Sequence, residues 1–160
     1  QAYPNGPIQR VQAFKPRSSD FAYISFGTND LGPGGSGNPN DPPASPSQIK
    51  INLETMIDEW IGRGLAPNRL MIATVPPRGV GQSSQVPTLN ALIRTLAQTK
   101  GVRLIDLSGF VSNDDGLTWK ASSGNPSYPG ALHVANDELH YSETVRNWLA
   151  DQIVSIMLSF

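Results

Sequence analysis

The sequence contains no cysteine, and this absence excludes several kinds of chemistry at once. Without thiols the chain can form neither a disulfide nor a thiolate zinc site, and it cannot use a Cys nucleophile. Only two histidines are present, His133 and His140, so a metal site built from several imidazole ligands is not expected. Long hydrophobic runs are missing too. The longest, such as residues 70–73, are far too short for a helix that spans a membrane.

Charge is also scarce. Charged residues make up 16% of the chain, the formal net charge is −1, and there is neither a basic block nor an acidic tail. Binding to a phosphate backbone requires clustered Lys and Arg, so nucleic acid is not an expected partner. What the chain does have is a length of 160 residues, 38% of them hydrophobic, which predicts one globular domain over residues 1–160.

Short apolar segments alternate with segments of helical periodicity. Residues 21–26, 70–75 and 102–107 are typical of buried strands. Apolar residues recur at helical spacing after each strand, and Ser47 and Ser142 are the predicted N-caps of the first and last helix. This alternation favours parallel pairing with right-handed crossovers. The sequence therefore predicts the α/β class, as a doubly wound parallel sheet between two helical layers.

Two long segments interrupt this pattern. Residues 32–46 are rich in Gly and Pro and follow the first predicted strand, and residues 112–136 precede the last helix with few periodic apolar positions. Loops of this length in a compact domain are usually functional or mobile. Both are expected beyond the carboxyl ends of the strands, where ligands bind in open α/β sheets.

The motif Gly27-Thr28-Asn29-Asp30 comes directly after the first predicted strand. A glycine allows a sharp turn and a close approach of the backbone to a ligand. An Asn just beyond a strand can aim its side-chain amide at a developing oxyanion. The alternative is ordinary turn chemistry, because Asn and Asp both favour turns.

A second motif, Asp137-Glu138-Leu139-His140, lies just before the last predicted helix. A carboxylate three residues before a His in a loop can orient the imidazole and stabilise its protonated form. The His can then serve as general base toward a hydroxyl and as general acid toward a leaving group. The alternative is a surface His near a helix start, with Asp137 as an ordinary loop residue.

Together, these motifs and the elements between them resemble the SGNH/GDSL hydrolase family over nearly the whole chain. The resemblance implies a flavodoxin-like three-layer fold and ester hydrolysis by a serine nucleophile. The family's Gly-x-Asn-Asp block matches residues 27–30, which implies that Asn29 and Gly27 line the oxyanion hole. Its Asp-x-x-His block matches residues 137–140, which implies that Asp137 is the acid and His140 the base. Gly6 is the candidate for a further oxyanion-hole glycine, with an Asn-Gly turn as the alternative.

The sequence departs from the family at the nucleophile. The family's first strand ends in Gly-Asp-Ser, and no Gly-Asp-Ser occurs in residues 1–160. A parallel sheet without that central strand would expose backbone groups along two edges. We therefore expect the domain to lack its N-terminal strand–helix unit here, and a companion N-terminal segment to supply the catalytic Ser.

Aromatic and imidazole side chains in and near the second long loop are candidate substrate contacts. Trp119 and Tyr128 could form an apolar or sugar-stacking wall, with local packing of the loop as the alternative. His133 and Tyr141 flank the predicted acid and base, although His133 is also typical of an ordinary surface histidine.

These observations predict a serine ester hydrolase that works through an acyl-enzyme and requires no cofactor or metal. Polar loops and the lack of a long apolar lid favour a small acyl ester, such as the O-acetyl group of a carbohydrate. The polar, cysteine-free chain suggests an extracellular or particle-surface location. The absent serine keeps a second hypothesis open, a non-catalytic module with the hydrolase fold that binds glycan or protein.

Overall fold

The computed structural model describes residues 11–32, 42–77, 84–120 and 142–160. Three parallel strands form one sheet in the order β1 (Ala22–Ile24), β2 (Leu70–Ala73) and β3 (Arg103–Ile105). In the register, Tyr23 pairs with Met71, and Ile72 pairs with Leu104. The predicted α/β class with a parallel sheet is confirmed.

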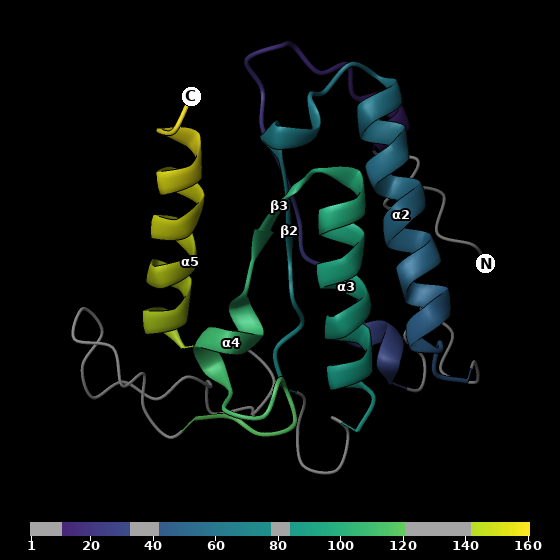
Figure 1. Cartoon of the computed structure of the whole chain (residues 1–160), viewed down its shortest axis with the longest axis vertical. Coiled ribbons are helices and arrows are strands. Elements are labelled where there is room, and N and C mark those ends of the chain that lie inside the picture. The colour runs from purple at the N-terminus through teal and green to yellow at the C-terminus, as the bar shows by residue number, and fades with distance from the viewer. Residues whose placement is uncertain (1–10, 33–41, 78–83, 121–141) are drawn as a thin grey trace.

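Helices cover both faces of the sheet (Figure 1). Helices α2 (Pro46–Gly62) and α3 (Val86–Lys100) pack on one face. The short α4 (Leu107–Val111) and α5 (Glu143–Met157) pack on the other. None of the described helices is long and apolar enough to cross a membrane.

A hydrophobic core lies on each face of the sheet, and β2 contributes side chains to both. This follows because successive side chains in a strand point to opposite faces. Leu70 and Ile72 belong to the cluster shared with α2 and α3. Met71 and Ala73 belong to the cluster shared with α4 and α5, which we call the α4–α5 core. All four side chains are buried, as a central strand requires.

The first helix begins two residues earlier than predicted, so the assignment of Ser47 as its N-cap is wrong. Ser45 is the N-cap, and its Oγ accepts a hydrogen bond of 3.2 Å from the Gln48 N–H. Pro46 then occupies the first helical position, where its fixed φ suits the helix and its missing N–H costs nothing. Ser142 is the N-cap residue of α5, as predicted.

The third strand ends earlier than predicted, and a helix follows it that the sequence did not predict. The strand stops at Ile105, and Asp106 caps α4 by accepting a 3.3 Å bond from the Gly109 N–H. Leu107 and Val111 of α4 are fully buried, and Phe110 is partly buried. Five residues are too few for helical periodicity to be recognised. The sequence therefore predicted a strand that extends to residue 107 in place of the start of α4.

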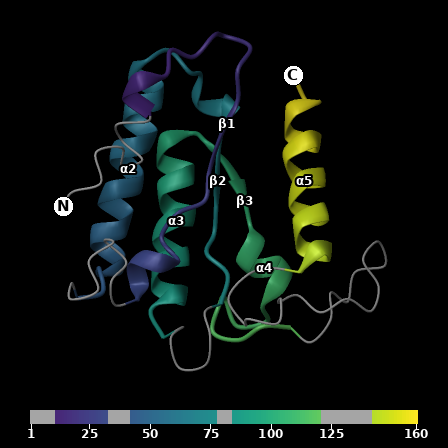
Figure 2. The same cartoon turned by 180° about the vertical axis from the view of Figure 1, so that it is seen from behind.

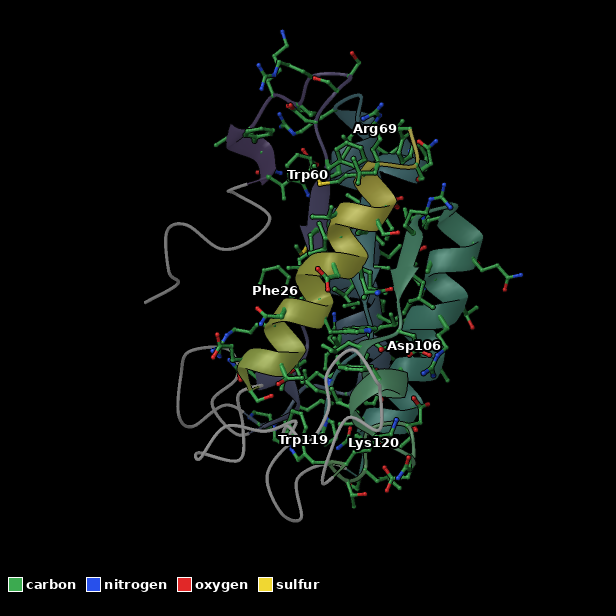
Figure 3. All side chains as sticks on the ribbon, turned by 90° about the vertical axis from the view of Figure 1, so that its left-hand side faces the viewer. Phe26, Trp60, Arg69, Asp106, Trp119 and Lys120 are labelled. Carbon is green, nitrogen blue, oxygen red and sulfur yellow. The ribbon has the colours of Figure 1, made fainter. Side chains whose placement is uncertain are left out.

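An aromatic cluster ties the end of α5 to the amino end of the sheet. The guanidinium of Arg69 lies 4.6 Å from the ring centres of both Phe21 and Phe160. The two rings meet edge to face at 5.3 Å. Figure 3 shows Arg69 at the end of the molecule opposite Trp119 and Lys120. Helix α5 is thereby fixed along the length of the sheet.

Candidate active site

The turn after β1 is built around Gly27. Its φ is +114°, a region that favours glycine. A Cβ at this position would lie 3.0 Å from Ile49 Cγ2 on α2 and 3.2 Å from Leu89 Cδ2 on α3. Glycine therefore allows the chain both to reverse and to pack against two helices, which fixes the position of the residues that follow.

Those residues form a short 3-10 helix, η1 (Asn29–Leu31). The Leu31 N–H donates to the Gly27 carbonyl at 3.3 Å, and the Leu31 side chain is buried. The Ala44 N–H donates to the Asp30 carbonyl at 2.8 Å, which ties η1 to the start of α2. The Asn29 side chain is exposed. Anchoring through Leu31 and Asp30 thus presents Asn29 to solvent at the carboxyl end of β1.

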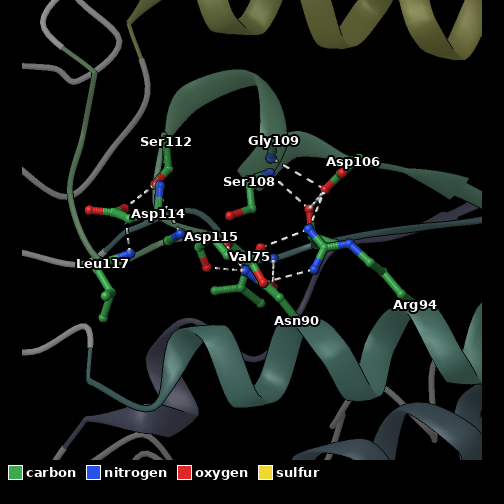
Figure 4. A network of polar contacts seen from close by, with 12 residues as sticks. Val75, Asn90, Arg94, Asp106, Ser108, Gly109, Ser112, Asp114, Asp115 and Leu117 are labelled. Atoms are coloured by element: carbon green, nitrogen blue, oxygen red, sulfur yellow. Dashed lines mark hydrogen bonds and ion pairs between the residues drawn. The ribbon is translucent and has the colours of Figure 1, made fainter.

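The carboxyl ends of β2 and β3 are joined by a polar network (Figure 4). Thr74 Oγ1, just after β2, donates to Asp106 Oδ1 at 3.0 Å. The same hydroxyl accepts a 2.8 Å bond from the Ser108 N–H in α4. These bonds fix the start of α4 to the end of the central strand.

Two polar side chains of α3 complete the network. Asn90 is fully buried, accepts from the Val75 N–H at 2.7 Å and donates to the Val75 carbonyl at 3.0 Å. Its amide also donates to the Asp115 carbonyl at 3.0 Å. Arg94 contacts both oxygens of the Asp115 carboxylate, at 2.8 and 2.7 Å, and Asp106 Oδ1 at 2.8 Å. Hydrogen bonding to Asp115, and less strongly to Asp106, raises the pKa of Arg94 above its usual value.

Sequence reasoning missed Asn90 and Arg94, although one signal was present. Asn90 is a polar residue within the apolar stripe of its helix, four residues after Val86 and three before Ile93. A polar side chain at a core position requires a hydrogen-bond partner. Arg94 gave no such signal because its carboxylate partners are 12 and 21 residues away in the chain.

The turn that follows α4 is closed by Asp114. Its Oδ1 accepts from the Leu117 N–H at 3.1 Å and from the Thr118 N–H at 2.8 Å. The hydroxyls of Ser112 and Thr118 also donate to this carboxylate. The bond from Ser112, followed by that from Thr118, lowers the pKa of Asp114 to about 2. The carboxylate is therefore ionised, as a closed turn of this kind needs.

Trp119 and Lys120 follow this turn and lie together in Figure 3. Trp119 packs against the α4–α5 core, and its Nε1 is buried without a hydrogen-bond partner in the described parts of the chain. Lys120 Nζ donates to the carbonyls of Gly109 and Phe110, at 2.9 and 3.0 Å. The contact with the core agrees with local packing of Trp119, and its role in binding substrate stays a prediction.

The described parts of the chain before and after residues 121–141 both contact the α4–α5 core. The Lys120 N–H donates to the Val111 carbonyl at 2.8 Å before this segment. After it, the rings of Phe110 in α4 and Trp148 in α5 stack at 4.2 Å with an interplanar angle of 5°. In Figure 1, α4, the first turn of α5 and the dark-blue η1 lie at the same end of the molecule as the carboxyl ends of the strands.

Several predicted site residues lie outside the described residues, and their roles stay predictions. They are Gly6, Tyr128, His133, Asp137, His140 and Tyr141. Within the described ranges, no three His, Asp or Glu side chains are grouped so that they could hold a metal ion.

Residues 3–145 match the GDSL-like lipase/acylhydrolase family. The chain belongs to this family. The resemblance inferred from residues 27–30 and 137–140 is thereby confirmed. A solved structure described as a lipase/acylhydrolase from Enterococcus faecalis is similar, with a TM-score of 0.57 and 21% sequence identity over 86% of this chain. At this identity the similarity shows a shared fold. Comparison with curated protein sequences gives no significant match.

The chain spans 61% of the length of that lipase/acylhydrolase. Asn29 is exposed in η1, beyond the carboxyl end of β1. Its role as an oxyanion donor stays a prediction.

Proposed function

We propose that this chain is part of a serine ester hydrolase that works through an acyl-enzyme, with its nucleophilic Ser on a preceding segment. The observation that supports this most directly is the turn at Gly27. It presents an exposed Asn29 at the carboxyl end of a parallel strand, in a chain of the GDSL-like family. That is the place where a side-chain amide can meet a reacting carbonyl oxygen.

In the proposed reaction the Ser hydroxyl attacks the ester carbonyl carbon while His140 accepts its proton. The Asn29 amide donates a hydrogen bond to the oxyanion that forms. When the tetrahedral intermediate collapses, the bond to the alcohol oxygen breaks, and His140 protonates the departing alcohol. A water molecule then attacks the acyl-enzyme with His140 as base, which releases the carboxylic acid and restores the Ser. Asp137 holds the His140 imidazole in the productive orientation.

The open edge of the sheet supports the proposed companion segment. Among the described residues, β1 pairs only with β2, and Figure 2 shows β1 at the edge of the sheet. An unpaired edge presents backbone N–H and C=O groups to which another strand can bind. Phe26, two residues after β1, is 46% exposed.

The surface of α5 adds a second reason. Val154 and Met157, one helical turn apart, are 51% and 44% exposed. A helix that followed the added strand and packed beside α5 would cover these side chains. In this proposal one strand–helix unit pairs with the edge of β1 and covers the exposed apolar side chains of α5.

For the substrate we propose a small acyl ester, with the O-acetyl group of a carbohydrate as the favoured case. The polar composition of residues 32–46 and 112–136 supports a polar alcohol rather than a lipid. An extracellular or particle-surface location would suit such a substrate.

The experiment compares two asparagines in the protein expressed from its full reading frame. Asn29 lies in η1 at the carboxyl end of the sheet, and Asn68 lies equally exposed in a second 3-10 helix, η2 (Pro67–Arg69), directly before β2. Loss of one oxyanion donor costs about 10²–10³-fold in kcat. We expect Asn29→Ala to lower kcat for p-nitrophenyl acetate by about that factor with little change in KM, and Asn68→Ala to leave both unchanged.

Equal activity of the two variants would show that Asn29 is not an oxyanion donor. A full-length protein that hydrolyses no ester at all would favour the non-catalytic binding module instead.

A further inference from the structure

The turn after α4 has an unusual backbone at its centre. Asp115 has a φ of +56°, and Gly116 follows with a φ of +101°. A positive φ is uncommon for a residue other than glycine, although Asp adopts it more readily than most. Asp115 is fixed by two side chains of α3.

These two side chains hold different parts of Asp115. Arg94 binds the carboxylate through two nitrogens, and Asn90 binds the main-chain carbonyl. Because they stand four residues apart, they project from the same face of α3. Side chain and backbone of one residue are thus held from a single rigid element.

Gly116, the next residue, packs closely against α3. A Cβ on Gly116 would lie 2.3 Å from Val86 Cγ1 and 3.1 Å from Asn90 Nδ2. The turn therefore has no room to move toward α3, and the two polar side chains prevent it from moving away.

Arg94 also connects the turn with the sheet. Its third short contact is with Asp106, which caps α4 and accepts from Thr74 at the end of β2. One guanidinium thus lies between two carboxylates, and its planar fork binds both oxygens of the Asp115 carboxylate through separate nitrogens.

The chain runs from this turn through Trp119 and Lys120 into residues 121–141, which include Asp137 and His140. We infer that Arg94 is a positioning residue. By fixing Asp115, it holds residues 116–120, the last described part of the chain before the acid and the base. This inference rests on the proposed function. A segment whose ends are fixed loses less conformational entropy when its side chains adopt the working geometry, and misplacement by about 1 Å can cost about 10²-fold in rate.

The solvent exposure of the ion pairs distinguishes a positioning role of Arg94 from a contribution to global stability. The Arg94 side chain is 33% exposed, and those of Asp106 and Asp115 are 48% and 35% exposed. Ion pairs so accessible to water contribute little to the free energy of unfolding. Loss of Arg94 should therefore disturb the turn and the reaction more than the global stability.

The test uses the protein expressed from its full reading frame, with Arg94→Met, Arg94→Lys and the control Lys100→Met. Lys100 lies on the same helix and also bridges two carboxylates, Glu54 and Asp58, but on the side of α2. We expect Arg94→Met to raise hydrogen exchange at the amides of residues 116–120 at least about tenfold. We also expect it to lower kcat for p-nitrophenyl acetate by about 10–100-fold with a smaller change in KM. Arg94→Lys should recover part of the rate, and Lys100→Met should change neither quantity.

Two results would overturn the inference in a protein that hydrolyses the ester. One is unchanged exchange at residues 116–120 in Arg94→Met. The other is faster exchange with a kcat equal to that of Lys100→Met, which would make the clamp purely structural. If the unsubstituted protein neither hydrolyses the ester nor reacts with a fluorophosphonate, the proposed function itself fails. That outcome is distinct from a failure confined to the Arg94 variants.

Discussion

Replacement of Gly27 by Ala should be one of the most damaging small substitutions in this chain. Two costs add. The positive φ of +114° is unfavourable for Ala, by about 1–3 kcal/mol. The added methyl group would also lie 3.0 Å from Ile49 and 3.2 Å from Leu89, both in the core, and overpacking of this kind costs about 1–3 kcal/mol. We expect Gly27→Ala to reduce the free energy of unfolding by about 4 kcal/mol in total.

The chain offers a matched control for this substitution. Gly64 has a similar φ of +97°, but a Cβ there would meet nothing within 4 Å. Gly64→Ala therefore carries the backbone cost alone, about 2 kcal/mol in the middle of the same range. The effect of Ala on the unfolded chain is the same in both variants and cancels in the comparison.

Urea denaturation measures both variants directly. With a slope of about 2 kcal/mol per M, the midpoint should fall by about 2 M for Gly27→Ala and by about 1 M for Gly64→Ala. Equal shifts in the two variants would refute the conclusion that Gly27 is required by its contacts with α2 and α3.

Two further predictions concern stability. Asp114 has a folded pKa of about 2 against 3.8 for the free side chain, so its contribution is present above about pH 4 and is lost as the pH falls toward 2. Asp114→Asn should flatten the unfolding free energy in that window, as measured by urea titrations between pH 2 and 5, and an unchanged acid dependence would contradict this. Ser45→Ala should cost about 1 kcal/mol by removing the N-cap of α2, whereas Ser47→Ala, within the first turn, should cost much less. A larger effect at Ser47 in thermal unfolding would support the start of the helix that the sequence suggested.

Apart from α4, the sequence predicted the order of strands and helices because apolar periodicity is strong in each of the others. It also placed the motif at Gly27 beyond the carboxyl end of a strand, although β1 ends at Ile24, three residues earlier. The structure adds the reason for the glycine, which is a positive φ combined with two tight contacts. Boundaries were less predictable. The sequence predicted Ser47 as the N-cap of α2, whereas the structure has Ser45. Both serines are suitable N-caps, and Pro46 distinguishes them because proline favours the first helical position.

The polar network was beyond prediction for a different reason. Arg94 meets Asp115 only because α3 packs beside the turn after α4, and contacts at that separation leave no local pattern. The left-handed backbone at Asp115 was equally hidden, since Asp tolerates this region without requiring it. The catalytic roles of Asp137 and His140 stay predictions from the sequence, and the structure shows how the turn at Asp115 is held against α3.

The most direct test of the central claim is to locate the nucleophile. The protein expressed from its full reading frame would be treated with a fluorophosphonate, which reacts with activated serines, and the modified peptide would be identified by mass spectrometry. The proposed mechanism predicts one adduct, on a Ser in a segment that precedes residue 1, and its loss in His140→Ala. An adduct on a Ser within residues 1–160 would contradict the claim that another segment supplies the nucleophile. Ester hydrolysis without any adduct would contradict the serine mechanism itself.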